Sequence, residues 1–405
     1  MTRIDRYAAP TELVYGDGVV DRIGAEIARL GGRRALVVTD AGLAGAGVAD
    51  RVGSILTGSD GVEFAGIWSD VPQDPTFADV DRLAARLTGD AVDTVVSLGA
   101  GSVMAAGRSA AVAVAEGKPV AEVAKAGADG ARSLLSVCVP TTAGSGGEVS
   151  RQATLTDDRS GQKSGVRGWA AAARLAVLDP ELLVSVPRGQ AIASGIDAMV
   201  HALEAYWSKR ATPLTDALAR PSFHTLVTLL PESLEKRDTA TLGPLLLAST
   251  MANLACGNAG LGLVHGLNKG IATVTHTKHY TGLSYGMLHA VLLPWVLRYN
   301  AGSGSAETDR RLTDLADDIG AADPPGGTGG ERLTTAITAW LDGLGAPSQL
   351  PWERCDDEDV EFIVQDTLGR PMWKDNARTA TEDDVRELLK LSLTDWRDTD
   401  LGGNR

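Results

Sequence analysis

The sequence predicts an α/β domain with a Rossmann-like, doubly wound parallel sheet, followed by an all-α domain. Short β-branched runs alternate with amphipathic helical patterns through the first half of the chain, which is typical of a parallel sheet. Long helical periodicity broken by glycine and proline replaces this alternation after Pro187. A chain of 405 residues is also too long for one ordinary core. We therefore expect two domains, 1–187 and 188–405.

Five apolar runs mark the expected strands of the first domain, and two long periodic stretches mark expected helices of the second. The strand runs are RRALVVTD (33–40), GVEFAGIWSD (61–70), DTVVSLGAGS (93–102), SLLSVCVPTTAGS (133–145) and ARLAVLDP (173–180). The helical stretches are SGIDAMVHALEAYWSKR (194–210) and VRELLKLSLTDW (385–396).

Composition excludes several classes of protein. The chain has 38 basic and 52 acidic residues, a formal net charge of -14, so it repels phosphate backbones and anionic lipid surfaces. We expect no nucleic-acid partner. Three widely spaced cysteines favour neither a disulfide framework nor a CxxC metal site. No signal-peptide order and no apolar run long enough to cross a bilayer are apparent, so we expect a cytoplasmic protein with no membrane contact.

Two glycine-rich turns follow expected strands. Gly99, Gly101 and Ser102 lead from an apolar run into a small-residue helix, and such a turn lets a pyrophosphate approach a helix N-terminus. A lone turn of this kind is more often structural. A second expected strand is followed by the loop TTAGSGGEVS, Thr141–Ser150. Two such loops in one sheet favour a ligand crevice at the strand ends.

Asp40 ends another expected strand and has two interpretations. A carboxylate there accepts hydrogen bonds from an adenosine ribose and repels a 2'-phosphate, which favours NAD over NADP. It is equally suited to cap the next helix. The residues leave both open.

A histidine and carboxylate cluster indicates a metal site in the second half. Asp197 and His201 are four residues apart on an expected helix and so share a face. All six histidines lie between His201 and His289, and His265 sits in a glycine-flanked apolar segment. Together Asp197, His201 and His265 form a donor set that suits Fe(II), Zn(II) or another divalent ion.

Motifs along nearly the whole chain resemble the iron-dependent, or group III, alcohol dehydrogenase family, with some features similar to maleylacetate reductase. The motifs are PTELVYGDGVVDRIG, VPQDPT, LGAGS, PTTAGSGGEVS, SGIDAMVHALEAY, GLVHG, AVLLPWVLRYN and DNARTATEDDVRELL. The resemblance implies the dehydroquinate synthase-like fold, with a dinucleotide-binding first domain, a metal- and substrate-binding helical second domain, and an active site in the cleft between them.

The resemblance also implies the chemistry: NAD(P)(H)-dependent interconversion of a small alcohol and an aldehyde or ketone, assisted by a divalent metal, in a homodimer. The substrate is small, with an anionic group as one option. Dinucleotide contacts carried over from the family are Asp40, Gly99, Gly101, Ser102, Thr141, Thr142, Ser145 and Lys163. Asp197, His201 and His265 match three of the four family metal ligands.

Departures from the family pattern fall at the active site. Ala105, Arg108 and Gly147 alter the glycine loops, Lys269 replaces a histidine one turn after the third ligand, and Tyr285 replaces the fourth ligand. Lys269 and Tyr285 become candidate proton donors.

Four outcomes remain open for the fourth ligand: His279, His289, no fourth protein ligand, or loss of the metal. These departures also keep alternative functions open, namely a metal-independent reductase, a non-redox lyase or cyclase, and a protein that only binds nucleotide.

Overall fold

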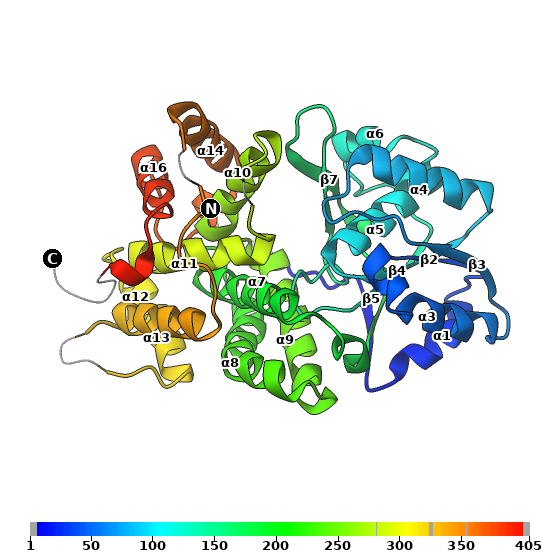
Figure 1. Cartoon of the computed structure of the whole chain (residues 1–405), viewed down its shortest axis with the longest axis horizontal. Coiled ribbons are helices and arrows are strands. Elements are labelled where there is room, and N and C mark those ends of the chain that lie inside the picture. The colour runs from blue at the N-terminus through cyan, green and yellow to red at the C-terminus, as the bar shows by residue number, and fades with distance from the viewer. Residues whose placement is uncertain (1–5, 281, 324–326, 353–354, 400–405) are drawn as a thin grey trace. The chain divides into compact units, whose positions relative to one another are not determined.

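The computed structural model describes residues 6–280, 282–323, 327–352 and 355–399. The chain divides into two compact units, which Figure 1 colours from blue to red along the sequence. The N-terminal unit comprises Ala8–Pro187 and Arg237–Thr250; the helical unit comprises 6–7, Arg188–Lys236 and 251–399. The segment Arg237–Thr250 belongs to the N-terminal unit although it lies beyond the range 1–187 that the sequence indicates.

A six-stranded parallel sheet forms the centre of the N-terminal unit, in the order β1-β8-β5-β4-β2-β3. All five expected strands are present. The sequence patterns missed the edge strand β1 and the antiparallel hairpin β6–β7. The bounds are β1 Glu12–Tyr15, β2 Arg34–Val38, β3 Glu63–Trp68, β4 Thr94–Gly99, β5 Leu135–Pro140, β6 Gln152–Thr156, β7 Lys163–Arg167 and β8 Leu175–Leu178.

Helices cover both faces of this sheet: α4 and α5 lie on one side of the strands and α1 and α3 on the other (Figure 1). Leu36 and Val95 of the sheet pack with Leu83 of α4 and Val103 of α5 in a continuous core. The expected doubly wound class is therefore confirmed. The helices are α1 Ile23–Arg29, α2 Ala41–Gly45, α3 Val48–Thr57, α4 Phe77–Gly89, α5 Gly101–Glu116 and α6 Val120–Ala126.

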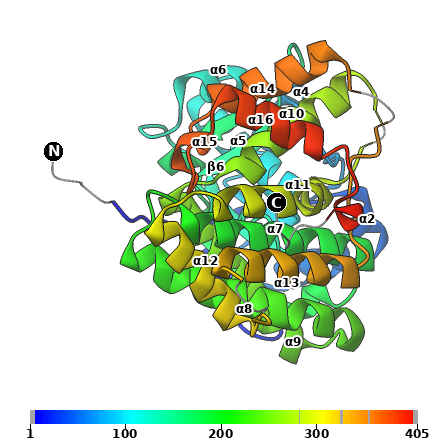
Figure 2. The ribbon, with the colours of Figure 1, turned by 90° about the vertical axis from the view of Figure 1, so that its left-hand side faces the viewer.

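The helical unit is built around α7, which Figure 2 shows between α11 and α8. Both expected helices are present but end earlier than predicted. The helix expected at 194–210 is part of α7, which ends at Trp207, and the helix expected at 385–396 is part of α16, which ends at Leu391. α10 packs against α11 and α14. The bounds are α7 Arg188–Trp207, α8 Pro213–Lys236, α10 Leu263–Thr277, α11 Tyr285–Ala301, α12 Ala306–Asp318, α13 Gly329–Gly343, α14 Asp357–Gly369, α15 Met372–Asp375 and α16 Glu382–Leu391. A further helix, α9 Thr239–Ala259, begins in the N-terminal unit and ends in the helical unit.

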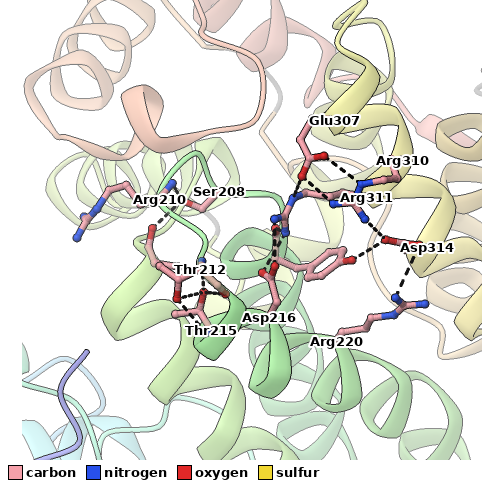
Figure 3. Close-up of polar contacts among 12 residues, drawn as sticks. Ser208, Arg210, Thr212, Thr215, Asp216, Arg220, Glu307, Arg310, Arg311 and Asp314 are labelled. Atoms are coloured by element: carbon pink, nitrogen blue, oxygen red, sulfur yellow. Dashed lines mark hydrogen bonds and ion pairs between the residues drawn. The ribbon is translucent and has the colours of Figure 1, made fainter. Parts of the chain in front are cut away.

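A charged network joins the end of α7 to α8 and α12 (Figure 3). Arg311 of α12 binds both carboxylate oxygens of Asp216 at 3.0 Å and donates to the carbonyl of Tyr206 at 2.6 Å. The Tyr206 hydroxyl donates to Asp314 at 2.8 Å. Because a cation at a helix C-terminus complements the helix dipole, Arg311 fixes the corner where α7 ends and α8 begins.

Among the described residues one helix, α9, is long and apolar enough to cross a membrane by length and composition alone, contrary to the expectation that the sequence holds no such run. Within its apolar window 67% is buried in the protein. A core helix of a folded domain meets the same criterion, and α9 is packed as one.

Candidate active site

One face of α7 carries the first part of the candidate metal centre. Asp197, His201 and Glu204 are spaced by four and three residues, which places their side chains in a row on a helix. His201 is 7% exposed and Glu204 is fully buried. His265 enters from the first turn of α10, and His289 from the second turn of α11.

Four nitrogen and oxygen atoms converge in this cluster. Asp197 Oδ1 lies 3.9 Å from His201 Nε2 and 3.7 Å from His265 Nε2. It lies 3.1 Å from His289 Nδ1, and the two Nε2 atoms of His201 and His265 are 3.0 Å apart. Tetrahedral ligands at about 2.1 Å from one metal ion would be separated by about 3.4 Å. The observed separations therefore fit the edges of a metal coordination polyhedron.

Unpaired polar atoms support the same conclusion. Among the residues that the structure describes, Asp197 Oδ1 and both ring nitrogens of the fully buried His289 have no hydrogen-bond partner of acceptable geometry. Buried polar atoms without partners are costly. A cation at the centre of the cluster would satisfy Asp197 and His289 together, so the donor set fits a divalent metal.

Protonation states favour ligation as well. Burial lowers the pKa of His201 to about 3 in spite of the Asp197 carboxylate, so this ring is neutral at neutral pH. Burial alone would raise the pKa of Asp197, but its contacts with His201, His265 and His289 hold that pKa well below its usual value. Burial also lowers the pKa of His289. A carboxylate beside two neutral imidazoles is a donor combination that suits Fe(II) or Zn(II).

Glu204 orients the third donor. Its Oε2 accepts from His265 Nδ1 at 2.7 Å, which fixes the tautomer and leaves the Nε2 lone pair facing Asp197 and His201. Carboxylates behind ligating histidines act in this way in metal sites. Burial opposes charge on His265, but the Glu204 carboxylate prevails and raises the pKa of this histidine. Glu204 was not among the predicted site residues, although it follows His201 by three residues and so lies on the same face of α7 as Asp197 and His201.

The two glycine-rich loops of the N-terminal unit meet at one edge of its sheet. β4 and β5 pair so that Gly99 lies opposite Pro140, and the Thr141 N–H donates to the Gly99 carbonyl at 3.2 Å. A Cβ at Gly101 would lie 2.8 Å from the Ser145 side chain. The loops are therefore in contact, and Gly101 is required for their close approach.

The C-terminal part of the loop at 141–150 is held by two buried side chains, Arg108 and Thr250. Arg108 donates to the carbonyls of Ser150, Gln152 and Ala171 at 2.6, 3.0 and 2.7 Å. Thr250 donates to the buried Glu148 carboxylate at 2.8 Å. The contact of Thr250 with Glu148 explains why Arg237–Thr250 belongs to the N-terminal unit. Arg108, one of the departures from the family pattern, holds the end of the loop in place.

The other predicted dinucleotide contacts already have partners within the unit. Asp40 caps α2 by accepting from the Leu43 N–H at 2.9 Å, which is one of its two expected roles. Lys163 on β7 donates to Asp74 at 2.6 Å. The Ser102 hydroxyl donates to the Gln73 carbonyl. Thr142 is buried at the end of β5 beside Thr141.

Comparison with known proteins decides the family. A model described as "Iron-containing alcohol dehydrogenase" matches residues 10–180, and one described as "Fe-containing alcohol dehydrogenase family, C-terminal" matches residues 191–393. The chain belongs to the iron-containing alcohol dehydrogenase family. The predicted family and the predicted oxidoreductase class are both confirmed.

Relatives of this iron-containing alcohol dehydrogenase match it almost end to end. The NAD-dependent methanol dehydrogenase of Bacillus methanolicus is 28% identical over 95% of this chain and 98% of its own. A crystal structure of 1,3-propanediol oxidoreductase superposes with a TM-score of 0.87 at 27% identity, covering 96% and 100% of the two chains. Maleylacetate reductase of Agrobacterium tumefaciens superposes with a TM-score of 0.75 at 25% identity, covering 97% and 99%.

Two of the residues that depart from the family pattern, Tyr285 and Lys269, lie on the helices that carry His289 and His265. The Tyr285 ring is 5.1 Å from that of His289 and 6.2 Å from that of His265, between ring centroids. Lys269 is 5% exposed and follows His265 by one turn of α10. The Tyr285 ring thus adjoins two of the donor rings, and Lys269 is placed by its spacing on the same face of α10 as His265.

His279 lies apart from the other candidate ligands. It follows the end of α10 with a positive φ of 55° and is exposed. α10 runs as a helix from Leu263 to Thr277, and at about 1.5 Å per residue a position 14 residues after His265 is about 21 Å farther along the axis. Among the described residues, the cluster is completed by His289 and not by His279.

Proposed function

We propose that this iron-containing alcohol dehydrogenase homologue is an NAD(H)-dependent enzyme that interconverts a small alcohol and an aldehyde or ketone with the help of a divalent metal. The observation that carries the proposal is the convergence of Asp197 Oδ1, His201 Nε2 and His265 Nε2, all within 4.8 Å of one another. His289 is the proposed fourth ligand, because its Nδ1 is 3.1 Å from Asp197 Oδ1.

When bound, Fe(II) or Zn(II) would polarise the carbonyl oxygen while NAD(H) takes or gives the hydride. The protein's own groups hold these partners and handle the proton. Asp197, His201, His265 and His289 would hold the metal, and Glu204 would keep His265 in its ligating tautomer. Tyr285, beside the cluster, and Lys269, one turn after His265 on α10, are the proposed donors of the proton that the alkoxide oxygen takes up.

Binding of the dinucleotide is assigned to the N-terminal unit. Its two joined loops place backbone N–H groups and the start of α5 at one sheet edge, which suits a pyrophosphate. Asp40 is proposed to bind the adenosine ribose with the carboxylate oxygen that does not cap α2, favouring NAD over NADP. The proposed contacts are Asp40, Gly99, Gly101, Ser102, Thr141, Thr142, Ser145 and Lys163.

A carbonyl substrate with an anionic group is the substrate class that Lys269 favours. A buried ammonium one turn from a metal ligand can pair with a carboxylate, and the similarity to maleylacetate reductase supports this choice. For Lys269→Met we expect a larger loss of turnover with carboxylated aldehydes than with uncharged ones. A cytoplasmic homodimer remains a prediction, to be checked by cell fractionation and light scattering.

The test of the proposed function is reconstitution with Fe(II), Zn(II) or no metal, followed by NADH absorbance across neutral and carboxylated aldehydes. We expect turnover with metal and its loss in Asp197→Ala. Equal turnover after exhaustive chelation would indicate a metal-independent reductase. A product formed without net change in NAD would indicate lyase or cyclase chemistry.

A further inference from the structure

A pair of buried amides lies next to the start of α10. Asn300 of α11 and Asn376, which follows α15, are both fully buried. Asn376 Nδ2 donates to Asn300 Oδ1 at 2.7 Å and to the Arg378 carbonyl at 2.8 Å. Because both donors of Asn376 are used in this way, its Oδ1 is held facing α10.

The N-cap residue of α10 is Gly262, which has no side chain with which to cap the helix. The first N–H groups of a helix have no partner within it, and here two distant side chains supply acceptors. The Leu263 N–H donates to Asn376 Oδ1 at 3.4 Å, and the Val264 N–H donates to Glu204 Oε1 at 2.8 Å. The next residue along the chain is His265.

The same two acceptors explain why the N-cap residue of α10 is a glycine. A Cβ at this position would lie 2.8 Å from Asn376 Oδ1 and 2.8 Å from Glu204 Oε1, closer than real Cβ atoms approach. The backbone angle is ordinary, with φ at -116°, so crowding and not backbone strain requires glycine. The usual capping residues, which carry a side chain, are therefore excluded here.

We propose that Asn376, locked by Asn300, is a positioning residue for the metal ligand His265. This inference rests on the proposed metal site. Asn376 fixes the first turn of α10 through the Leu263 N–H, and Glu204 fixes both that turn and the imidazole. The position of a ligand on the first turn of a helix is only as well defined as the backbone of that turn. Metal sites need their ligands positioned to within about 0.5 Å.

Asn376→Ala in the full-length protein tests this proposal by direct Zn(II) titration against a chromophoric chelator. We expect affinity about tenfold weaker than that of the wild type, as for lost outer partners of metal ligands. Hydrogen exchange of the metal-free protein adds a second readout. Amides of 262–266 should exchange faster in Asn376→Ala.

Thr328→Ala is the matched control. Thr328 caps α13 of the same unit in a capping box with Glu331, so its loss should lower the unfolding temperature and leave Zn(II) affinity unchanged. Asn376→Ala with reduced stability but wild-type affinity and exchange would overturn the proposal, because Asn376 would then be merely structural.

Gly262→Ala perturbs the same contact from the other side and serves if Asn376→Ala does not fold. It should weaken Zn(II) binding, and the double variant should lose less than the sum of the two single losses because both act on one contact. Strict additivity would contradict the coupling. A wild type that binds no Zn(II) or Fe(II) would instead refute the proposed metal site itself.

Discussion

His289 Nδ1 lies 3.1 Å from Asp197 Oδ1, which joins the second turn of α11 to the middle of α7. The resemblance to the family places the fourth ligand one helical turn earlier, at Tyr285. A shift of one turn along the same helix keeps the side chain on the same face. We therefore propose that the fourth donor has been relocated from position 285 to His289.

Removing the relocated donor should weaken metal binding. We expect His289→Ala to lower the affinity for Zn(II) or Fe(II) on the order of 100-fold. Loss of a hydrogen-bond partner of a metal ligand costs up to about that much, and loss of a ligand itself should cost at least as much. The measurement is competition titration, with His276→Ala as control because His276 is exposed. Adding Tyr285→His to His289→Ala should restore part of the affinity. Unchanged affinity in His289→Ala would show that three protein ligands suffice.

Glu204→Gln should be more harmful than its small size change suggests. An amide nitrogen opposite His265 Nδ1 would donate to that ring atom, and the imidazole proton would move to Nε2, where the metal should bind. We expect metal affinity to fall about 10- to 100-fold. Metal analysis after dialysis at fixed free Zn(II) would measure this. Affinity retained in Glu204→Gln would argue against a tautomer-fixing role.

The sequence predicted the elements that depend on local pattern and failed where tertiary contacts decide. The strands of the sheet and the pair Asp197 and His201 follow from periodicities of two and 3.6 residues. The approach of His289 to Asp197 depends on how α11 packs on α7, which no local pattern encodes. The bond from Leu263 to Asn376 spans 113 residues. His279 illustrates the opposite case. It follows His265 by only 14 residues, but the helix α10 separates the two residues in space.

Arg108→Met should unfasten the loop at 141–150. Arg108 is 2% exposed, and its guanidinium satisfies three carbonyls on two separate segments besides one on its own helix. Leaving those carbonyls unpaired should cost about 3 kcal/mol of unfolding free energy. NADH affinity, measured by fluorescence, should fall with it. Arg132→Met, an exposed arginine of the same unit, should change neither quantity.

Asp40→Ser separates the two roles of this carboxylate. Serine can still cap α2, so stability should be retained, but the negative charge that repels a 2'-phosphate is lost. Like charges about 4 Å apart repel by about 1–4 kcal/mol near a protein surface, so the preference for NADH over NADPH should fall at least about tenfold. Steady-state kinetics with both cofactors would measure the change. An unchanged preference would leave Asp40 with capping alone.

Arg311→Lys should destabilise the helical unit although it conserves charge. The Arg311 side chain is 14% exposed and makes a two-pronged contact with Asp216, which an ammonium group cannot reproduce. It also donates to the Tyr206 carbonyl at the end of α7. We expect a loss of about 2 kcal/mol in chemical denaturation. Arg310→Lys is the matched control, because Arg310 is adjacent but 53% exposed, and exposed ion pairs contribute about 0–1 kcal/mol. Equal losses in the two variants would contradict the role of Arg311 in fixing the corner between α7 and α8.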